Sequence, residues 1–181
     1  MAKLIMQPNQ AEAFERNPEA NIACTIPGIG RFRFNIFRQR NEIAMVVRAI
    51  PSKVPSFKEL GIPSMLRDIV MLKRGLVLVV GPSGTGKSTT LAAMVEHRNT
   101  NDVSHIVTVE DPIEYLLDHK RSIVNQREIG VDTTSYHNAL INALRQSPDV
   151  IMVGEIRSGA VMEDVLEFSD TGHLVLATMH A

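Results

Sequence analysis

The chain has 181 residues, enough for one ordinary domain or for a small domain followed by part of another, and its single cysteine, Cys24, excludes an internal disulfide. Its 19 lysines and arginines balance 20 aspartates and glutamates, so the formal net charge of -1 gives no general attraction to nucleic acid or to acidic membranes. The longest clean apolar run, residues 76–80, is far shorter than the roughly 20 residues of a membrane span, and no secretory signal is recognisable, so we expect a cytosolic protein without a transmembrane segment.

Residues 21–50 carry the pattern of β-structure. Two segments that flank the turn signal at residues 27–30 predict a hairpin, since the second of them alternates polar and apolar residues with period two. Residues 43–50 are a third strand candidate. The alternation breaks at Phe37, which predicts a bulge or a strand end there. We therefore expect residues 1–50 to form a small domain of their own.

A linker is predicted at residues 51–60, because two prolines fall within its first five residues. Beyond it, from residue 61 to residue 181, extended and helical patterns alternate. The strand candidates are short and apolar on both faces: 76–80, 106–109, 150–153 and 174–177. The helix candidates are 62–72, 87–97, a helix from Thr134 to Pro148, and 160–169. This alternation predicts an α/β domain built on a parallel sheet.

The most specific motif follows the first of these strands. It reads Gly81-Pro82-Ser83-Gly84-Thr85-Gly86-Lys87-Ser88 and matches G-x-x-x-x-G-K-[ST], with a helix-forming run from Thr89 onward. Glycines let such a loop curl, so that its backbone N–H groups and the helix N-terminus face a pyrophosphate. Lys87 would reach the β- and γ-phosphate oxygens, and the Ser88 hydroxyl could ligate Mg²⁺. The loop therefore predicts a nucleoside triphosphate site.

A phosphate loop of this kind also needs carboxylates near its metal, and two strand ends supply them. Glu155 follows the strand at 150–153, where it could hold Mg²⁺ or a water molecule bound to it. Glu110 ends the strand that begins at residue 106 and could orient or deprotonate the attacking water. The alternative for each is a structural role as a helix cap or a solvated loop residue.

Two groups of basic residues have a functional and a structural reading. Span 31–48 holds five arginines and one glutamate, a local charge of +4 (five minus one), which suits phosphate but also a solvated strand face. His173 and His180 bracket the last strand, either as hydrogen-bonded structural residues or as sensors of the γ-phosphate. The other histidines lack metal-ligand spacing, so no metal beyond Mg²⁺ is expected.

Three absences narrow the class of phosphate-loop protein. The sequence has no Asn-Lys-x-Asp, the guanine-reading device of GTPases, and no Leu-Ser-Gly-Gly-Gln, the signature of transporter ATPases. Its nearly balanced charge gives no support for a DNA translocase.

Three further motifs resemble those of the type II/type IV secretion ATPases, specifically their pilus-retraction branch, the PilT/PilU family. Residues 109–114 look like the Asp box of that family, residues 145–157 like its Walker B motif and residues 171–180 like its His box. With the phosphate loop these are four motifs in the right order over nearly the whole chain. The segments that look more like PilU than PilT are 74–77, 119–124 and 126–133.

The resemblance implies a RecA-like ATPase core preceded by part of a PAS-like α+β N-terminal domain. It also implies a homo-hexamer that uses ATP and Mg²⁺ to power pilus retraction and twitching motility at the cytoplasmic face of the inner membrane. The implied partners are a paralogous retraction ATPase and the inner-membrane pilus platform, and no nucleic acid. The implied roles are Glu110 as catalytic acid or base, Glu155 on Mg²⁺ and water, Arg31 and Arg33 on phosphate, and His173 and His180 near the γ-phosphate or the subunit interface.

The sequence departs from the family pattern at two positions, with Ser158 where the Walker B run usually continues with Asp and Asp170 where Glu commonly precedes the His box. We expect the chain to be truncated at both ends, with its last strand, 174–177, unpaired and uncovered. Three hypotheses stay open: a motor subunit, a nucleotide-binding accessory that regulates a paralogous motor, and an inactive fragment.

Overall fold

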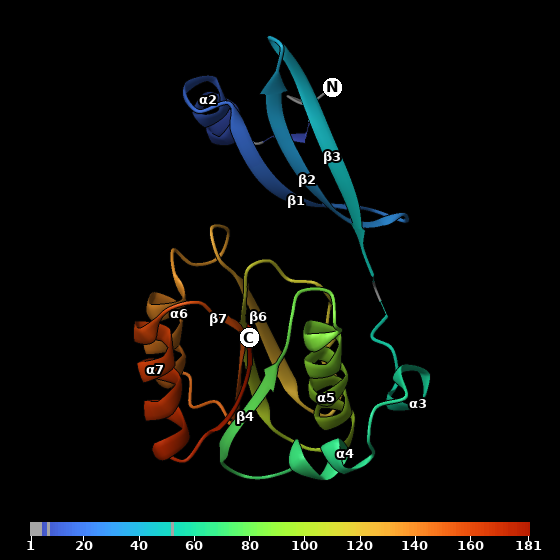
Figure 1. Cartoon of the computed structure of the whole chain (residues 1–181), viewed down its shortest axis with the longest axis vertical. Helices are drawn as coiled ribbons and strands as arrows, with labels where there is room; N and C mark the ends of the chain where they lie inside the picture. The colour runs from blue at the N-terminus through green and yellow to red at the C-terminus, as the bar shows by residue number, and fades with distance from the viewer. Residues whose placement is uncertain (1–4, 7, 52) are drawn as a thin grey trace. The chain divides into compact units, whose positions relative to one another are not determined.

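The computed structural model describes residues 5–6, 8–51 and 53–181, and the chain divides into two compact units after residue 52. The first unit is a three-stranded antiparallel sheet in the order β1-β2-β3, with helix α2 packed on one face (Figure 1). Its elements are α2 (Pro8–Arg16), β1 (Glu19–Ile26), β2 (Gly30–Gln39) and β3 (Glu42–Ile50). Phe14 of α2 is buried against Phe34 and Ile36 of β2. The three strands were predicted from the sequence, and the helix was not.

The bulge predicted at Phe37 is wrong. Phe37 pairs with Glu19 of β1 and with Ala44 of β3 in unbroken register, and β2 continues to Gln39. The break in alternation has another cause. The next residue, Arg38, lies on the face that α2 covers, and its guanidinium pairs with Glu15 of α2 at 3.2 Å. An ion pair at the end of the sheet thus takes the place of an apolar contact.

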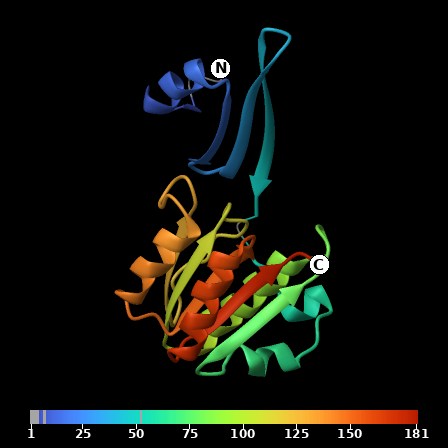
Figure 2. The same cartoon turned by 60° about the vertical axis from the view of Figure 1, so that its left-hand side comes forward.

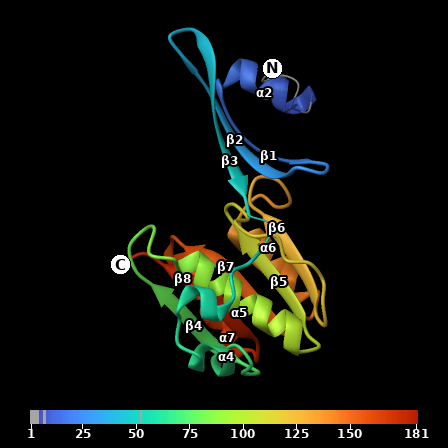
Figure 3. The same ribbon diagram turned by 90° about the vertical axis from the view of Figure 1, so that its right-hand side faces the viewer.

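The second unit is a five-stranded parallel sheet in the order β4-β8-β7-β5-β6, with helices on both faces (Figures 2 and 3). The strands are β4 (Gly75–Val80), β5 (His105–Glu110), β6 (Ile123–Glu128), β7 (Val150–Ile156) and β8 (Leu174–Met179). Helices α3 (Phe57–Leu60), α4 (Met65–Ile69) and α5 (Lys87–Asn101) pack on one face, and α6 (Tyr136–Leu144) and α7 (Gly159–Asp170) on the other. The predicted α/β fold with a parallel sheet is confirmed.

Each face of the sheet carries its own apolar core. Leu174 and Leu176 of β8 pack into the core beneath α5, while Val175 and Ala177, which point the opposite way, pack into the core beneath α6 and α7. All four side chains are fully buried. Burial on both faces explains why these strands are continuous apolar runs and do not alternate.

The last strand is not at an edge, contrary to the expectation from the sequence. β8 pairs with β4 on one side, where Gly75 lies opposite Leu174, and with β7 on the other. The crossover through α7 returns the chain to the position between β4 and β7, so the order of the strands in the sheet differs from their order in the sequence. Among the described strands, β4 and β6 form the edges, and Leu78 and Val80 of β4 are partly exposed.

The second half of the predicted linker is folded. Ser56 caps α3, since its hydroxyl accepts from Glu59 N–H at 3.3 Å and the Glu59 carboxylate accepts from Ser56 N–H at 2.7 Å. Phe57 is buried in the core beneath α5. The pattern Ser-x-x-Glu is a capping-box signal, and the linker prediction, which was based on the prolines, did not use it.

Two other element boundaries differ from the prediction. The helix expected over residues 62–72 is reduced to α4, after Gly61 in the left-handed conformation and Pro63. Strand β6 was not predicted, because it is an edge strand that alternates exposed and buried residues without an apolar run. None of the helices in the described part of the chain has the length and apolarity needed to cross a membrane.

Arg98 of α5 is a buried charge that joins separate segments of the second unit. Its Nη1 donates to the carbonyl oxygens of Val70 and Leu72, just after α4, at 2.8 and 2.6 Å. Its Nε donates to Ser104 Oγ at 3.1 Å, and its Nη2 pairs with Asp102 at 3.0 Å. The turns before β4 and before β5 are therefore anchored to one side chain.

We predict that Arg98→Met lowers the free energy of unfolding of this unit by about 3–5 kcal/mol, because it leaves two carbonyls and a carboxylate without their charged partner. Urea unfolding followed by circular dichroism measures the loss. The control, Arg121→Met, removes an exposed arginine that donates to one backbone carbonyl, and should change stability by less than about 0.5 kcal/mol. Equal losses in the two variants would contradict the anchoring role.

Candidate functional site

The carboxyl edge of the parallel sheet gathers most of the predicted site residues. The glycine-rich loop follows β4, Glu110 ends β5, Glu155 lies near the end of β7, and His180 comes directly after β8. Because all five strands run in the same direction, these residues share one edge, which is where ligands bind in open α/β sheets.

The loop of residues 81–88 is curled around the amine of Lys87. Gly84 and Gly86 have φ angles of 78° and 89°, a left-handed conformation that glycine adopts without strain. Lys87 is buried, and its Nζ donates to the Pro82 carbonyl oxygen at 2.9 Å. Gly86 is the N-cap of α5 and brings no side-chain cap to the first N–H groups of the helix. Uncapped N–H groups beside an ammonium fit a phosphate group.

Glu110 is a buried carboxylate at the mouth of the sheet. Its side chain is 7 % exposed, and its Oε1 accepts from Thr108 Oγ1 at 2.6 Å and from Gln126 Nε2 at 3.1 Å. Burial raises the pKa of Glu110, while these hydrogen bonds favour the ionised form and oppose the rise. The environment is that of a group poised for proton transfer.

Glu155 lies where the regular pairing of β7 is interrupted. The register with β8 shifts between Val153 and Ile156, and the carbonyl oxygen of Gly154 is satisfied by the Thr178 hydroxyl at 2.6 Å. Such irregularities re-aim a side chain, and here the Glu155 side chain meets Arg157 and His180.

Both oxygens of Glu155 are engaged. Its Oε2 accepts from Arg157 Nε at 2.7 Å, and its Oε1 lies 2.7 Å from His180 Nε2. Arg157 also pairs with Asp111 at 3.0 Å, so the ends of β5, β7 and β8 are joined by one ionic network. To ligate a metal directly, Glu155 would have to exchange one of these partners.

The donor set fits Mg²⁺ that arrives with a nucleotide. No cluster of three or more His, Cys, Asp or Glu able to hold a metal is present among the described residues. Mg²⁺ is usually held by one or two protein oxygens, water and substrate phosphates. The half-buried Ser88 hydroxyl at the start of α5 and the Glu155 carboxylate are oxygen donors of this kind.

His173 does not belong to this edge of the sheet. It precedes β8, its carbonyl oxygen accepts from Gly75 N–H at 3.0 Å, and its ring packs edge-on against Phe168. A six-residue strand is about 20 Å long, so His173 lies far from the phosphate loop within this chain. The predicted contact with the γ-phosphate is wrong for this subunit's own site, because residues that bracket a strand end up at opposite edges.

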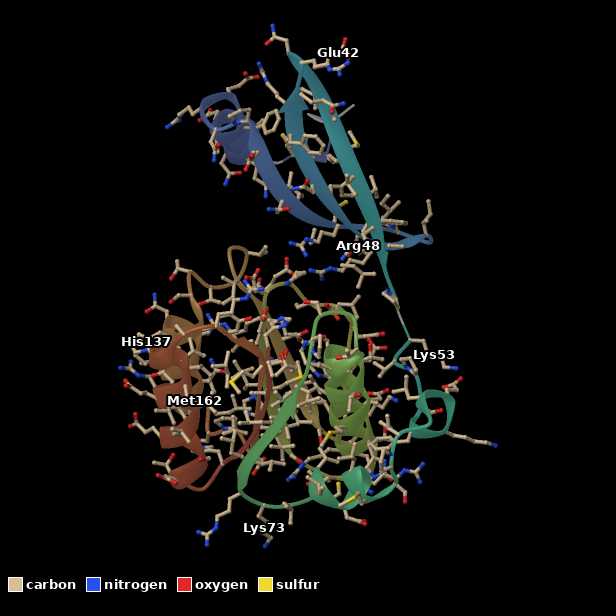
Figure 4. The ribbon with its side chains drawn as sticks, in the orientation of Figure 1. Glu42, Arg48, Lys53, Lys73, His137 and Met162 are labelled. Carbon is tan, nitrogen blue, oxygen red and sulfur yellow. The ribbon has the colours of Figure 1, made fainter. Side chains whose placement is uncertain are left out.

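Arg31 and Arg33 belong to the first unit. They lie on the face of β2 opposite to the one that α2 covers, since they alternate with Phe32 and Phe34 of the core. Arg33 pairs across the strands with Arg48, which Figure 4 labels on β3. This juxtaposition of like charges is unfavourable without an anion. Their role at a nucleotide stays a prediction.

Several residues of the carboxyl edge were not predicted from the sequence. Gln126 of β6 contacts the predicted residue Glu110, and Tyr115 of the loop after β5 contacts the predicted residue Thr89. The hydroxyl of Tyr136 is buried and has no partner among the described residues, and burial raises the pKa of Tyr136. No spacing rule identifies these side chains, because strand register and crossovers bring them to the site.

The two departures from the family pattern have simple structural settings. Ser158 is the N-cap of α7, and its Oγ accepts from Val161 N–H at 3.4 Å, a role that serine and aspartate share. Asp170 is exposed at the end of the same helix.

Comparisons with known proteins place the chain in a family. The model of the Type II/IV secretion system protein family matches residues 6–181. The type IV pilus ATPase PilU of Pseudomonas aeruginosa is 51% identical over 177 residues, which cover 98% of this chain and 46% of PilU. The type IV pilus retraction ATPase PilT of the same organism is 45% identical over 176 residues, which cover 97% of this chain and 51% of PilT.

A solved structure agrees with these relatives. The crystal structure of the pilus retraction motor PilT with bound ADP superposes with a TM-score of 0.97 at 46% identity, over 99% of this chain and 52% of that one. The chain thus spans about half the length of the relatives it matches. The fold, the shared edge and these similarities lead to one conclusion: the chain belongs to the Type II/IV secretion system protein family, in its pilus-retraction branch.

Proposed function

We propose that this chain is the nucleotide-binding core of a type IV pilus retraction ATPase, which hydrolyses ATP to ADP and phosphate to drive twitching motility. The main observation behind the proposal is the buried Lys87 at the uncapped start of α5, with its amine inside the glycine-rich loop. It lies at the same edge of the sheet as the buried Glu110. The similarity to PilU and to ADP-bound PilT supports ATP as the nucleotide.

Residues 81–89 would bind the phosphates. The backbone N–H groups of the loop and the start of α5 face the β-phosphate, and Lys87 exchanges the Pro82 carbonyl oxygen for phosphate oxygens. Ser88 and Glu155 would hold Mg²⁺, which neutralises charge on the phosphate oxygens. An ammonium that already makes one hydrogen bond to oxygen needs only a small movement to make another.

Glu110 would act as the general base toward the attacking water. Its raised pKa means that it binds a proton more readily than an exposed glutamate, while its hydrogen-bond donors favour the ionised form. Acidification protonates the base, so turnover should fall at a pH above the ordinary range of glutamate. His180 is held by Glu155 and could report on the bound phosphate to the neighbouring strand.

The assembly is part of the same proposal. Arg31 and Arg33 would supply guanidinium groups to a nucleotide in a homo-hexamer, where charge from another domain or subunit stabilises phosphoryl transfer. The ring would work at the cytoplasmic face of the inner membrane with the pilus platform and a paralogous retraction ATPase. His173 could then serve a subunit interface.

A second function, regulation of a paralogous motor by a slowly hydrolysing subunit, is favoured by one observation: identity is higher to PilU, at 51%, than to PilT, at 45%. The two functions differ in turnover by the protein alone. A motor hydrolyses ATP by itself, whereas an accessory binds ATP and changes the rate of its partner.

We predict that Lys87→Ala weakens ATP·Mg binding at least tenfold, because each charge-assisted hydrogen bond is worth about 1.5–3 kcal/mol. Isothermal titration calorimetry measures the dissociation constant. Lys73→Ala is the matched control, since Lys73 precedes β4 at the opposite edge of the sheet (Figure 4). Unchanged affinity in Lys87→Ala would remove the phosphate loop from the proposal.

We predict that Glu110→Gln keeps ATP affinity within a few fold while kcat falls by roughly 10²–10⁴, because the base is lost and its shape is kept. The comparison uses steady-state ATPase kinetics in a preparation whose parent protein turns over. Glu163→Gln, on the exposed face of α7, is the control and should leave both parameters unchanged. A kcat within twofold of the parent would mean that another group activates the attacking water, with Glu155 the next candidate.

A further inference from the structure

We propose that Gln126 is the positioning residue of this site: its side-chain amide holds the Glu110 carboxylate and the loop of residues 111–118 together, and so couples the phosphate loop to the general base. The inference deepens the proposed function and rests on it for the role of Glu110. Its own content, which is the restraint of Glu110 by Gln126, can be tested without turnover.

Both ends of the Gln126 side-chain amide make hydrogen bonds. Its Oε1 accepts from Leu117 N–H at 2.8 Å, and its Nε2 donates to the Tyr115 carbonyl oxygen at 2.9 Å and to Glu110 Oε1 at 3.1 Å. A backbone N–H can only donate and a carbonyl oxygen can only accept, so these two partners fix which end of the amide carries the nitrogen. The group that faces Glu110 is therefore a hydrogen-bond donor.

Side-chain donors from two neighbouring strands converge on the Glu110 carboxylate. Thr108 Oγ1 donates from the same strand at 2.6 Å, and Gln126 Nε2 donates from β6 at 3.1 Å. Gln126 lies on the strand next to Thr108, with which it is in register. Each donor stabilises the ionised form and limits rotation of the carboxylate. Of the two, only Gln126 also makes hydrogen bonds to the loop.

The loop in turn contacts the start of α5. The Tyr115 hydroxyl lies 3.3 Å from Thr89 Oγ1, two residues after Lys87. A continuous path therefore runs from the phosphate-binding segment through Thr89, Tyr115 and Gln126 to Glu110. Sheet order alone would keep these ends apart, because β8 and β7 lie between β4 and β5. Phosphate that displaces the start of α5 would act on the orientation of the base through this path.

The test compares two substitutions at the same residue. Gln126→Glu keeps the size of the side chain and an acceptor for Leu117 N–H, but it replaces the donor that faces Glu110 and the Tyr115 carbonyl oxygen with a carboxylate oxygen, and so adds negative charge there. Gln126→Met removes every hydrogen bond without adding charge. Gln146→Met is the control, since Gln146 is an exposed residue of the turn before β7.

The first readout is the pKa of Glu110 without nucleotide, from ¹³C carboxyl NMR titration with Glu110→Gln used for assignment. We expect both Gln126 variants to raise this pKa, because Gln126→Met removes a donor to the ionised form and Gln126→Glu also places a like charge beside it, and the control to leave it unchanged. The other ionisable groups around Glu110 are Glu114 on the loop, Glu128 opposite it on β6 and Tyr136 on α6, and all three are kept in every variant.

The second readout is steady-state ATPase kinetics. We expect kcat to fall about tenfold to a hundredfold with KM for ATP within threefold, and the acid limb of the kcat profile to move to higher pH. Loss of thermal stability with the pKa of Glu110 and kcat both unchanged would overturn the proposal and leave Gln126 a structural residue.

The two proposals fail separately. If the parent protein binds nucleotide but never turns over, and the Gln126 variants still raise the pKa of Glu110, the restraint stands and the hydrolytic function falls. If the parent turns over and the variants match it in both readouts, the hydrolytic function stands and the positioning role falls.

Discussion

The common direction of the five strands in the second unit is the constraint on which the site depends. Parallel pairing sends every strand end to the same edge, so residues from the ends of β4, β5, β7 and β8 meet although they come from positions as far apart in the chain as Gly81 and His180. Parallel strands also need long crossovers, and these place helices on both faces and bury the inner strands β5, β7 and β8. The apolar strands and the polar edge are thus two results of one pairing rule.

The sequence carries strong information on local features and little on order in the sheet. The phosphate loop is a contiguous motif whose glycines and lysine have a direct physical reason, so it was located with its helix. The position of β8 between β4 and β7 depends on which strands pair, and no short pattern records this. For the same reason His173 and His180, which look equivalent around one strand, were both assigned to the site although only His180 lies at its edge.

The features missed at the site are also explained by register. Gln126 lies in an edge strand of mixed polarity, and only its pairing with Thr108 brings it to Glu110. Ser56 and Glu59 carried a readable cap signal that was not used. The capping-box rule predicts that helix from the sequence, whereas no local sequence pattern predicts the contact of Gln126 with Glu110. Local chemistry can be predicted, and contacts across strands require the fold.

Gly154 bears on the mutational tolerance of the whole edge. A Cβ atom there would lie 3.2 Å from the Cα of Glu110 and 3.4 Å from both the Val109 carbonyl oxygen and the Tyr136 hydroxyl. Backbone at that distance cannot yield without moving β5 away from β7. The spacing between the strand that carries Glu110 and the strand that carries Glu155 is therefore set by a residue with no side chain, and even the smallest substitution at Gly154 would act on two carboxylates that it never touches chemically.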